Sequence, residues 1–334
     1  MSSSPTRLVW LDVSRVFAML LVVYIHFFPN GVFSIPGGLF VTAAVPFYFF
    51  WAGYFAANNV THTKVWRRVS LLFITFITWE LLALGYHVWH LQETVDLASI
   101  LGIGGLFFSP LCYVEAVPYI VTLWFIRDLI LLTILTPFII RYKLLGWIFI
   151  ALMITYAPLN MLPEIHVTMS MGAICIYMCG CYARSWNIAE KLELIPLRTH
   201  TFFFIGLLIP VTLIACKNEF IKGNSFIYSS WDPTIAGSLL GILLITQVGI
   251  IIHRLFPTMG VKIGLLAPSM VFVLITHRFL GAFYWHQIKD TWLGYIYAPL
   301  IFAVCVLLFK LIKQFTPKLL PYLAYCGTPD FFKK

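Results

Sequence analysis

The sequence predicts an all-α protein, a polytopic transmembrane helical bundle, and three observations support this fold class. Of 334 residues, 61% are hydrophobic and only 10% are charged, whereas soluble domains carry about 25% charged residues. Apolar runs near the ~20-residue length that spans a bilayer recur about ten times along the chain. Lysine and arginine gather in alternate connecting segments, as membrane topology requires.

The apolar runs follow one another along the whole chain, at 8–28, 37–57, 66–90, 117–140, 143–159, 166–184, 199–216, 233–252, 263–285 and 293–315. The stretch 97–111 is shorter and interrupted by glycines, so we expect a re-entrant or interfacial segment there. The first run lacks a cleavage-site pattern and is expected to stay in the protein. With no linker, repeat or appended soluble domain visible, residues 1–334 are expected to form a single membrane domain.

The distribution of positive charge predicts the orientation of the bundle. If the N-terminus is cytoplasmic, most of the 22 lysines and arginines lie in cytoplasmic segments, and the outer loops contain only Lys217, Lys222 and Lys289. Both termini are then cytoplasmic. The net charge of +9 follows from this asymmetry, so we expect the lipid bilayer as a partner and no nucleic acid.

Three ionisable residues lie in the first apolar run. Arg15 and His26 are eleven residues apart, which places them on one helix face about 16 Å apart along the axis. Asp12 lies three residues before Arg15 and is able to pair with it. The orientation places Arg15 toward the cytoplasm and His26 toward the outside. Two simpler readings remain: Arg15 snorkels to the headgroups, and His26 is an interfacial histidine.

Other runs also carry ionisable groups at membrane depth, where such residues are costly and tend to mark function. Glu80 lies in the third run and His277 in the ninth. Trp124, Arg127 and Asp128 share a face of the fourth run. Together they predict a polar cavity among the first, third, fourth and ninth runs. A purely structural Arg127–Asp128 pair is an alternative.

Two further clusters have both a functional and a simpler reading. Lys64, Arg67 and Arg68 precede the third run and are suited to hold an anion, although the positive-inside bias alone also explains them. Cys175, Cys179 and Cys181 lie close together without a flanking histidine or carboxylate. We therefore expect small packing residues there rather than a metal site.

Several segments resemble the acyltransferase-3 family of integral membrane acyltransferases. The run LDVSRVFAMLLVVYIHF is similar to the opening signature of the family, an arginine, ten residues and a histidine. The segment VPFYFFWAGYFAANN (45–59) resembles its Pro-x-Phe-Phe-x-x-Ser-Gly-Tyr run, with Ala52 in the serine position. LWFIRDLIL resembles its Leu-Trp-Phe segment. ITHRFLG resembles its late histidine-containing helix, without the common tyrosine before the histidine.

The resemblance implies a membrane O-acyltransferase of the sugar O-acetyltransferase type. Such an enzyme moves an acyl group, usually acetyl, from cytoplasmic acyl-CoA to a hydroxyl of a cell-surface or lipid-linked glycan. It implies the bacterial cytoplasmic (inner) membrane, acetyl-CoA or another acyl-CoA as donor substrate, no tightly bound cofactor and no metal.

The same resemblance suggests roles for the residues already singled out. His26 is expected to act as general base, or alternatively to form a transient acyl-histidine. Arg15, held by Asp12, is expected to orient the donor, and Lys64, Arg67 and Arg68 to attract its phosphates. Supporting or acceptor contacts are assigned to Glu80, Trp124, Arg127, Asp128 and His277.

A transporter or exporter of a polar solute is the rival function, with the buried charges as a relay. Such proteins often show inverted repeats or paired broken helices, and neither is visible in this sequence.

Overall fold

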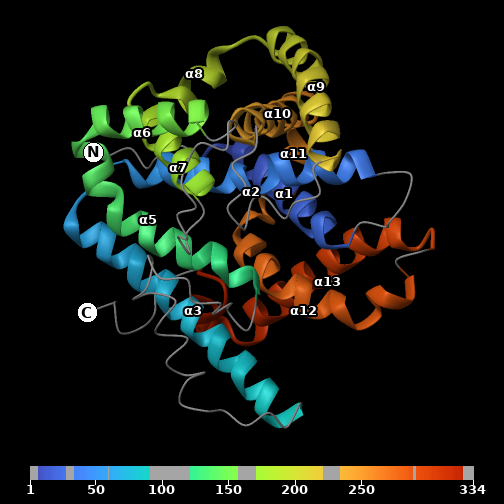
Figure 1. The fold of residues 1–334 in the computed structure, drawn as a ribbon. Coiled ribbons are helices and arrows are strands. Elements are labelled where there is room, and N and C mark those ends of the chain that lie inside the picture. Colours follow the sequence, from blue (N-terminus) through green and yellow to red (C-terminus); the bar gives the residue numbers. More distant parts are fainter. Residues whose placement is uncertain are drawn as a thin grey trace. The chain divides into compact units, whose positions relative to one another are not determined.

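The computed structural model describes residues 7–27, 34–58, 60–90, 121–156, 171–220, 234–288 and 291–325. These residues form helices joined by short connections, with no β-strand among them (Figure 1). The predicted all-α class is therefore confirmed.

Each predicted apolar run overlaps one of the long helices in the described part of the chain. The long helices are α1 (Val9–His26), α2 (Ser34–Ala56), α3 (His62–His90), α5 (Trp124–Arg141), α6 (Lys143–Tyr156), α7 (Met171–Arg184), α9 (Leu197–Phe220), α10 (Thr234–Leu255), α12 (Met270–Ile288) and α13 (Gly294–Phe315). Shorter elements are α8 (Ile188–Leu194), α11 (Pro257–Gly264), α14 (Leu320–Leu323) and the 3-10 turns η1 (Val121–Leu123), η3 (Ala267–Ser269) and η4 (Pro317–Leu319). The predicted re-entrant segment 97–111 lies outside the described residues.

The lengths and hydropathies of these helices identify an integral membrane protein. Within the described part of the chain, five stretches are long and apolar enough to cross a bilayer: Val9–His26, His62–Tyr86, Gly237–Leu255, Pro257–Gly281 and Gly294–Phe315. Two bent helix pairs, α5 with α6 at 113° and α8 with α9 at 114°, raise the count to as many as seven if each pair is one span. The ten crossings and the cytoplasmic termini stay predictions.

The chain divides into two compact units, each built from separate segments. The first comprises Met1–Tyr48, Ile188–Lys222 and Ala236–Val306. Its centre is α1, which packs against α11 and α12. Ser14 Oγ lies 3.0 Å from Trp10 O and 3.3 Å from Ile245 O of α10. Gly249 permits this approach, because a Cβ there would lie 1.9 Å from Ser14 Oγ.

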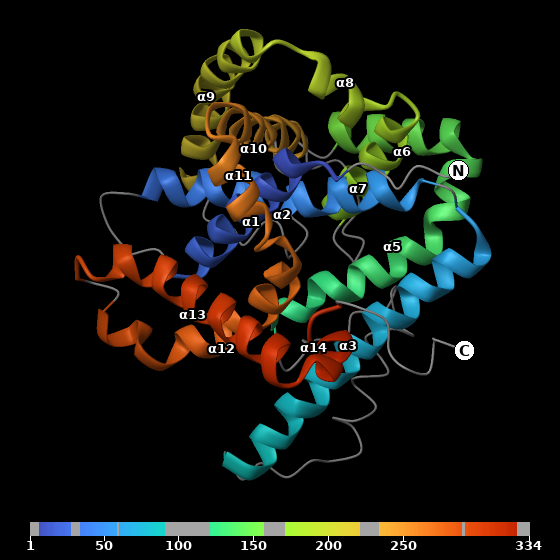
Figure 2. The same ribbon diagram turned by 180° about the vertical axis from the view of Figure 1, so that it is seen from behind.

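The second unit comprises Phe49–Asn187, Gly223–Ile235 and Leu307–Lys334. In it α3 runs beside α5, as both views show (Figures 1 and 2). The C-terminal turn α14 packs on α3, where Trp79 Nε1 donates to Leu323 O at 2.9 Å and Thr75 Oγ1 donates to Pro321 O at 3.4 Å. These bonds fix the end of the described chain to the middle of α3.

Two glycines set the crossing of α2 with α7 in the second unit. A Cβ on Gly53 would lie 2.2 Å from Tyr177 O, and one on Gly180 would lie 2.0 Å from Phe50 O. The contacts run in opposite directions along the two helices, so the helices cross antiparallel. Beside them, Arg184 Nη1 donates to Tyr54 Oη at 3.0 Å. The Gly-Tyr pair of the 45–59 segment therefore serves helix packing.

We expect Gly53→Ala to lower the free energy of unfolding by about 1–3 kcal/mol, because the added methyl group meets a backbone carbonyl that cannot move aside. The measurement is the melting temperature of the purified protein in detergent. Gly85→Ala is the matched control, since nothing lies within 4 Å of a Cβ there. An unchanged melting temperature for Gly53→Ala would contradict the close crossing.

Candidate active site

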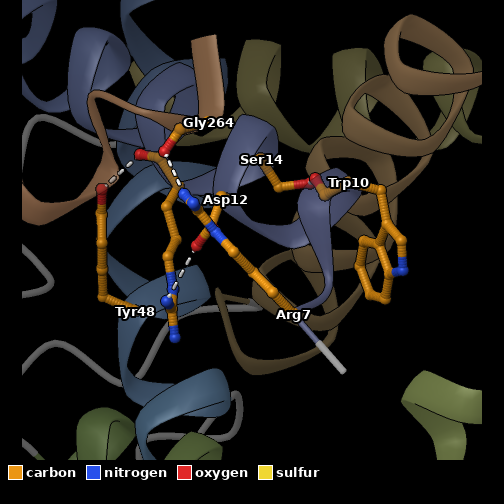
Figure 3. A network of polar contacts seen from close by, with 7 residues as sticks. Arg7, Trp10, Asp12, Ser14, Tyr48 and Gly264 are labelled. Atoms are coloured by element: carbon orange, nitrogen blue, oxygen red, sulfur yellow. Dashed lines mark hydrogen bonds and ion pairs between the residues drawn. The ribbon is translucent and has the colours of Figure 1, made fainter. Parts of the chain in front are cut away.

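A polar network surrounds Asp12 at the start of α1 in the first unit (Figure 3). Arg7 Nε donates to Asp12 Oδ2 at 2.6 Å, and Arg15 Nη1 donates to Asp12 Oδ1 at 3.3 Å. Arg7 Nη2 also donates to Gly264 O of α11 at 2.8 Å, and the Tyr48 hydroxyl donates to Arg15 O. The network therefore joins α1 to α2 and α11.

The position of Asp12 in the helix explains why it organises this network. It lies in the first turn of α1, where the helix dipole favours negative charge. Its side chain is 12% exposed, against 52% for Arg7 and 35% for Arg15. The carboxylate is thus the buried member, while both arginine side chains keep part of their surface exposed.

The predicted Asp12–Arg15 pair is confirmed, but sequence reasoning missed the other members of the network. Arg7 precedes the helix, which begins at Val9, so helical spacing gives no direction for its side chain. Tyr48 lies in another helix, and its bond to a backbone carbonyl leaves no sequence signal.

At the far end of α1, His26 meets His277 of α12. The two imidazole centroids are 5.1 Å apart, with their planes tilted by 38°. His277 is fully buried, whereas His26 is partly exposed. His26 of the first run and His277 of the ninth run therefore lie side by side, while the predicted polar cavity among the four runs stays a prediction.

Phe27 and Gly281 hold the two histidines together. The Phe27 ring packs edge-on against His277, with centroids 6.2 Å apart, and against Tyr297 at 5.5 Å. A Cβ on Gly281 would lie 2.0 Å from Phe27 Cζ, so only glycine admits the ring there. Tyr297 Oη donates to Gly281 O at 2.8 Å. The end of α1 is consequently seated directly on α12.

The second unit contains the predicted buried charges of α5. Arg127 Nε and Nη2 lie 3.0 and 2.8 Å from Asp128 Oδ1, and both side chains are buried. Trp124 packs against Phe49, with ring centroids 6.0 Å apart. Glu80 is buried on α3, which packs against α5. A cavity that joins these residues to those of α1 and α12 stays a prediction.

The predicted donor-binding cluster lies at the start of α3. Lys64 and Arg67 are exposed, and Arg68 is half-buried, with Nη2 donating to Phe55 O at 3.0 Å. Tyr325, which follows α14, is close enough to be influenced by this cluster. Burial raises the pKa of Tyr325, and the charges of Arg68 and Arg67 partly offset that rise. Sequence reasoning missed Tyr325, since no motif marks it.

The described residues also bear on a metal site. They contain no group of three or more His, Cys, Asp or Glu side chains placed to hold an ion. Cys175 and Cys181 are buried on α7, and the Cys181 backbone nitrogen lies 3.2 Å from the position of a Gly53 Cβ.

Comparison with known proteins assigns the chain to a family. A family model described as an acyltransferase domain matches residues 8–311, from the start of α1 into α13. The chain belongs to the acyltransferase-3 family. Comparison of this membrane acyltransferase with curated proteins and with solved structures found no match. The matched region includes both ends of α1 and the α3 cluster.

In this acyltransferase, we expect Asp12→Asn to destabilise the fold more than Arg7→Gln. The carboxylate holds two arginines, whereas the half-exposed Arg7 is one of two donors to it. Loss of charge-assisted hydrogen bonds suggests about 1–3 kcal/mol for Asp12→Asn. Melting temperatures in detergent measure both, with Lys262→Gln, a change at an exposed residue of α11, as control. Arg7→Gln as the more damaging change would contradict the central place of Asp12.

For the buried pair on α5, we expect Arg127→Met and Asp128→Leu each to destabilise the acyltransferase more than the double variant does. A single change leaves one buried charge without its neighbour, whereas the double change removes both. A double-mutant cycle in melting temperature tests this expectation. Additive losses would show that the two residues do not act as a pair, and acyl transfer by the double variant separates a structural pair from a functional one.

Proposed function

We propose that this acyltransferase moves an acyl group, with acetyl as the first candidate, from cytoplasmic acyl-CoA to a hydroxyl of a cell-surface or lipid-linked glycan. The bacterial cytoplasmic membrane is the proposed location. The observation that supports the proposal best is α1 itself. This unbroken apolar helix carries Arg15, paired with Asp12, near one end and His26, packed on His277, at the other.

The charges at the start of α1 suit the donor substrate. Acyl-CoA carries its phosphates at the nucleotide end and its reactive carbonyl at the tip of a thin arm. Arg7 and Arg15 share a single carboxylate, so the network retains a net positive charge on two partly exposed side chains. Guanidinium groups bind phosphate through paired, charge-assisted hydrogen bonds. We assign Arg15 to orient the donor in this way.

The basic cluster of α3 supplies a second cationic surface. Lys64 and Arg67 are exposed at the start of the helix, while Arg68 is anchored to Phe55 O. We assign these three residues to attract the nucleotide phosphates. The supporting roles of Glu80, Trp124, Arg127 and Asp128 are part of the same proposal.

At the other end of α1, His26 is proposed as the general base. It takes the proton of the acceptor hydroxyl while the oxygen attacks the thioester carbonyl. The C–S bond then breaks, and the departing thiolate of CoA receives the proton from the imidazole. Histidine suits this exchange because its ordinary pKa lies near neutrality. Transfer through an acyl-histidine is the second route we consider.

The rival function, export of a polar solute, has no support from the family comparison, which identifies an acyltransferase domain. Two experiments separate the functions. Purified protein is given labelled acetyl-CoA and tested for binding and release of CoA. Cell-surface glycans are also weighed by mass spectrometry with and without the gene, where a loss of one acyl mass identifies both the transferred group and the acceptor.

We expect His26→Ala to reduce acyl transfer by a factor of about 10²–10⁴, the usual contribution of a general base. Arg15→Lys should also reduce transfer, since a point charge does not replace the planar guanidinium fork. The measurement is glycan acylation by mass spectrometry, normalised to membrane-inserted protein.

The control for these variants is His62→Ala, which removes an exposed histidine of α3 whose Nε2 accepts a hydrogen bond from Trp66 Nε1 at 2.7 Å. It should acylate normally. Normal acylation by the His26→Ala variant would contradict the proposal that His26 is the general base.

A further inference from the structure

The protonation of His277 follows from its hydrogen bond. His277 Nδ1 lies 2.9 Å from Val273 O on the preceding turn of α12. A carbonyl oxygen only accepts hydrogen bonds, so Nδ1 carries the hydrogen. In the neutral ring the other nitrogen, Nε2, is then an acceptor with an available lone pair.

This acceptor has no hydrogen-bond partner among the described residues, although the side chain of His277 is fully buried. Buried polar atoms in native proteins are nearly always satisfied by a hydrogen-bond partner. The Nε2 atom of His277 is therefore placed to accept a hydrogen bond from a neighbouring donor.

Among the described residues, His26 is a ring neighbour of His277 that can donate. Its ring centroid is 5.1 Å from that of His277, a separation at which a modest ring rotation brings an N–H of one imidazole within hydrogen-bond distance of a nitrogen of the other. Phe27, packed on Gly281, occupies another side of His277 and has no polar atom in its ring. His26 is partly exposed and His277 is not, so a substrate reaches His26 first.

We propose that His277 is a positioning residue for His26. Its Nε2 accepts the N–H of His26, which leaves the remaining nitrogen of His26 unprotonated and directed to the acceptor hydroxyl. When His26 takes the hydroxyl proton, the resulting imidazolium keeps its bond to His277. The proton then passes to the thiolate of CoA, and His277 gains and loses none. The inference rests on the proposed function, in which His26 is the base.

The test compares two variants of His277. His277→Gln keeps an acceptor near the position of Nε2, whereas His277→Leu fills the same buried space without one. We expect His277→Leu to lower kcat about 100-fold or more, with the KM values for acyl-CoA and acceptor within about twofold. His277→Gln should recover at least a tenth of the wild-type kcat. A structural role alone predicts the opposite for leucine, which suits a buried apolar site and should retain activity.

His253→Leu is the matched control. His253 lies on α10 and has a buried ring nitrogen without a hydrogen-bond partner in the described part of the chain. That nitrogen lies against Gly260 of α11, 3.0 Å from the position of a Cβ there, and no step of the proposed transfer uses it. Its replacement should therefore leave kcat unchanged. Melting temperatures confirm that each variant is folded.

A spectroscopic measurement tests the tautomer directly. Nitrogen-15 NMR of histidine-labelled protein, with the His26 signals assigned by their loss in His26→Ala, should show one tautomer of His26 in the wild type and a mixture in His277→Leu. A mixture in the wild type overturns the proposal.

The outcomes separate this inference from the proposed function. If His26→Ala abolishes transfer but His277→Leu keeps the wild-type kcat, or raises only KM, positioning by His277 is wrong and the proposed function stands. An equal loss of kcat in the His277→Gln and His277→Leu variants would also show that no hydrogen-bond acceptor is needed at this position. If His26→Ala itself transfers acyl groups normally, the proposed function fails first.

Discussion

The ion pairs of Asp12 are the interaction on which the rest of the first unit depends. An arginine in a membrane-length apolar helix is costly unless it is paired, and Asp12 accepts from both Arg7 and Arg15. The same arginines connect α1 to its surroundings, through Gly264 O and through the Tyr48 hydroxyl on Arg15 O. These contacts fix one end of the helix whose other end seats His26 on His277. The Asp12 ion pairs and the proposed catalytic histidine therefore lie at opposite ends of the same helix, α1.

The family signature mixes residues with different tasks. Gly53 and Tyr54 lie in the segment that resembles the Ser-Gly-Tyr run, and both pack against α7, the glycine on Tyr177 O and the tyrosine on Arg184. Ala52 in the serine position leaves this crossing intact, so the crossing does not require a hydroxyl there. Arg15 and His26 differ from these packing residues, since both keep side-chain surface exposed.

The sequence was sufficient for the fold class, the helix positions and the Asp12–Arg15 pair, because composition, apolar run length and three-residue spacing are local properties. It was insufficient for contacts between distant segments. The packing of His26 on His277, and of Phe27 on Gly281, joins α1 to α12, and no periodicity encodes that register. The number of membrane crossings could not be predicted from local sequence either, since a bend of 113° between α5 and α6 depends on tertiary packing. The start of α11 at Pro257, ahead of the run predicted from 263, reflects a proline at the first turn of a helix, where its missing N–H costs nothing.

The distances along the chain in the Asp12 network have a consequence for biosynthesis. Both ion pairs of Asp12 are local, three and five residues apart, whereas Arg7 meets Gly264 across 257 residues and Ser14 meets Ile245 across 231. At ~5–20 residues per second, the late partners emerge roughly 10–50 s after α1. During that interval the first helix already contains the counter-charge that makes its residence in lipid tolerable. A ribosome that stops before α10 would thus leave α1 with its charge paired but without its contacts to Ile245 and Gly264. Quality control would then recognise the missing helices rather than an unpaired charge.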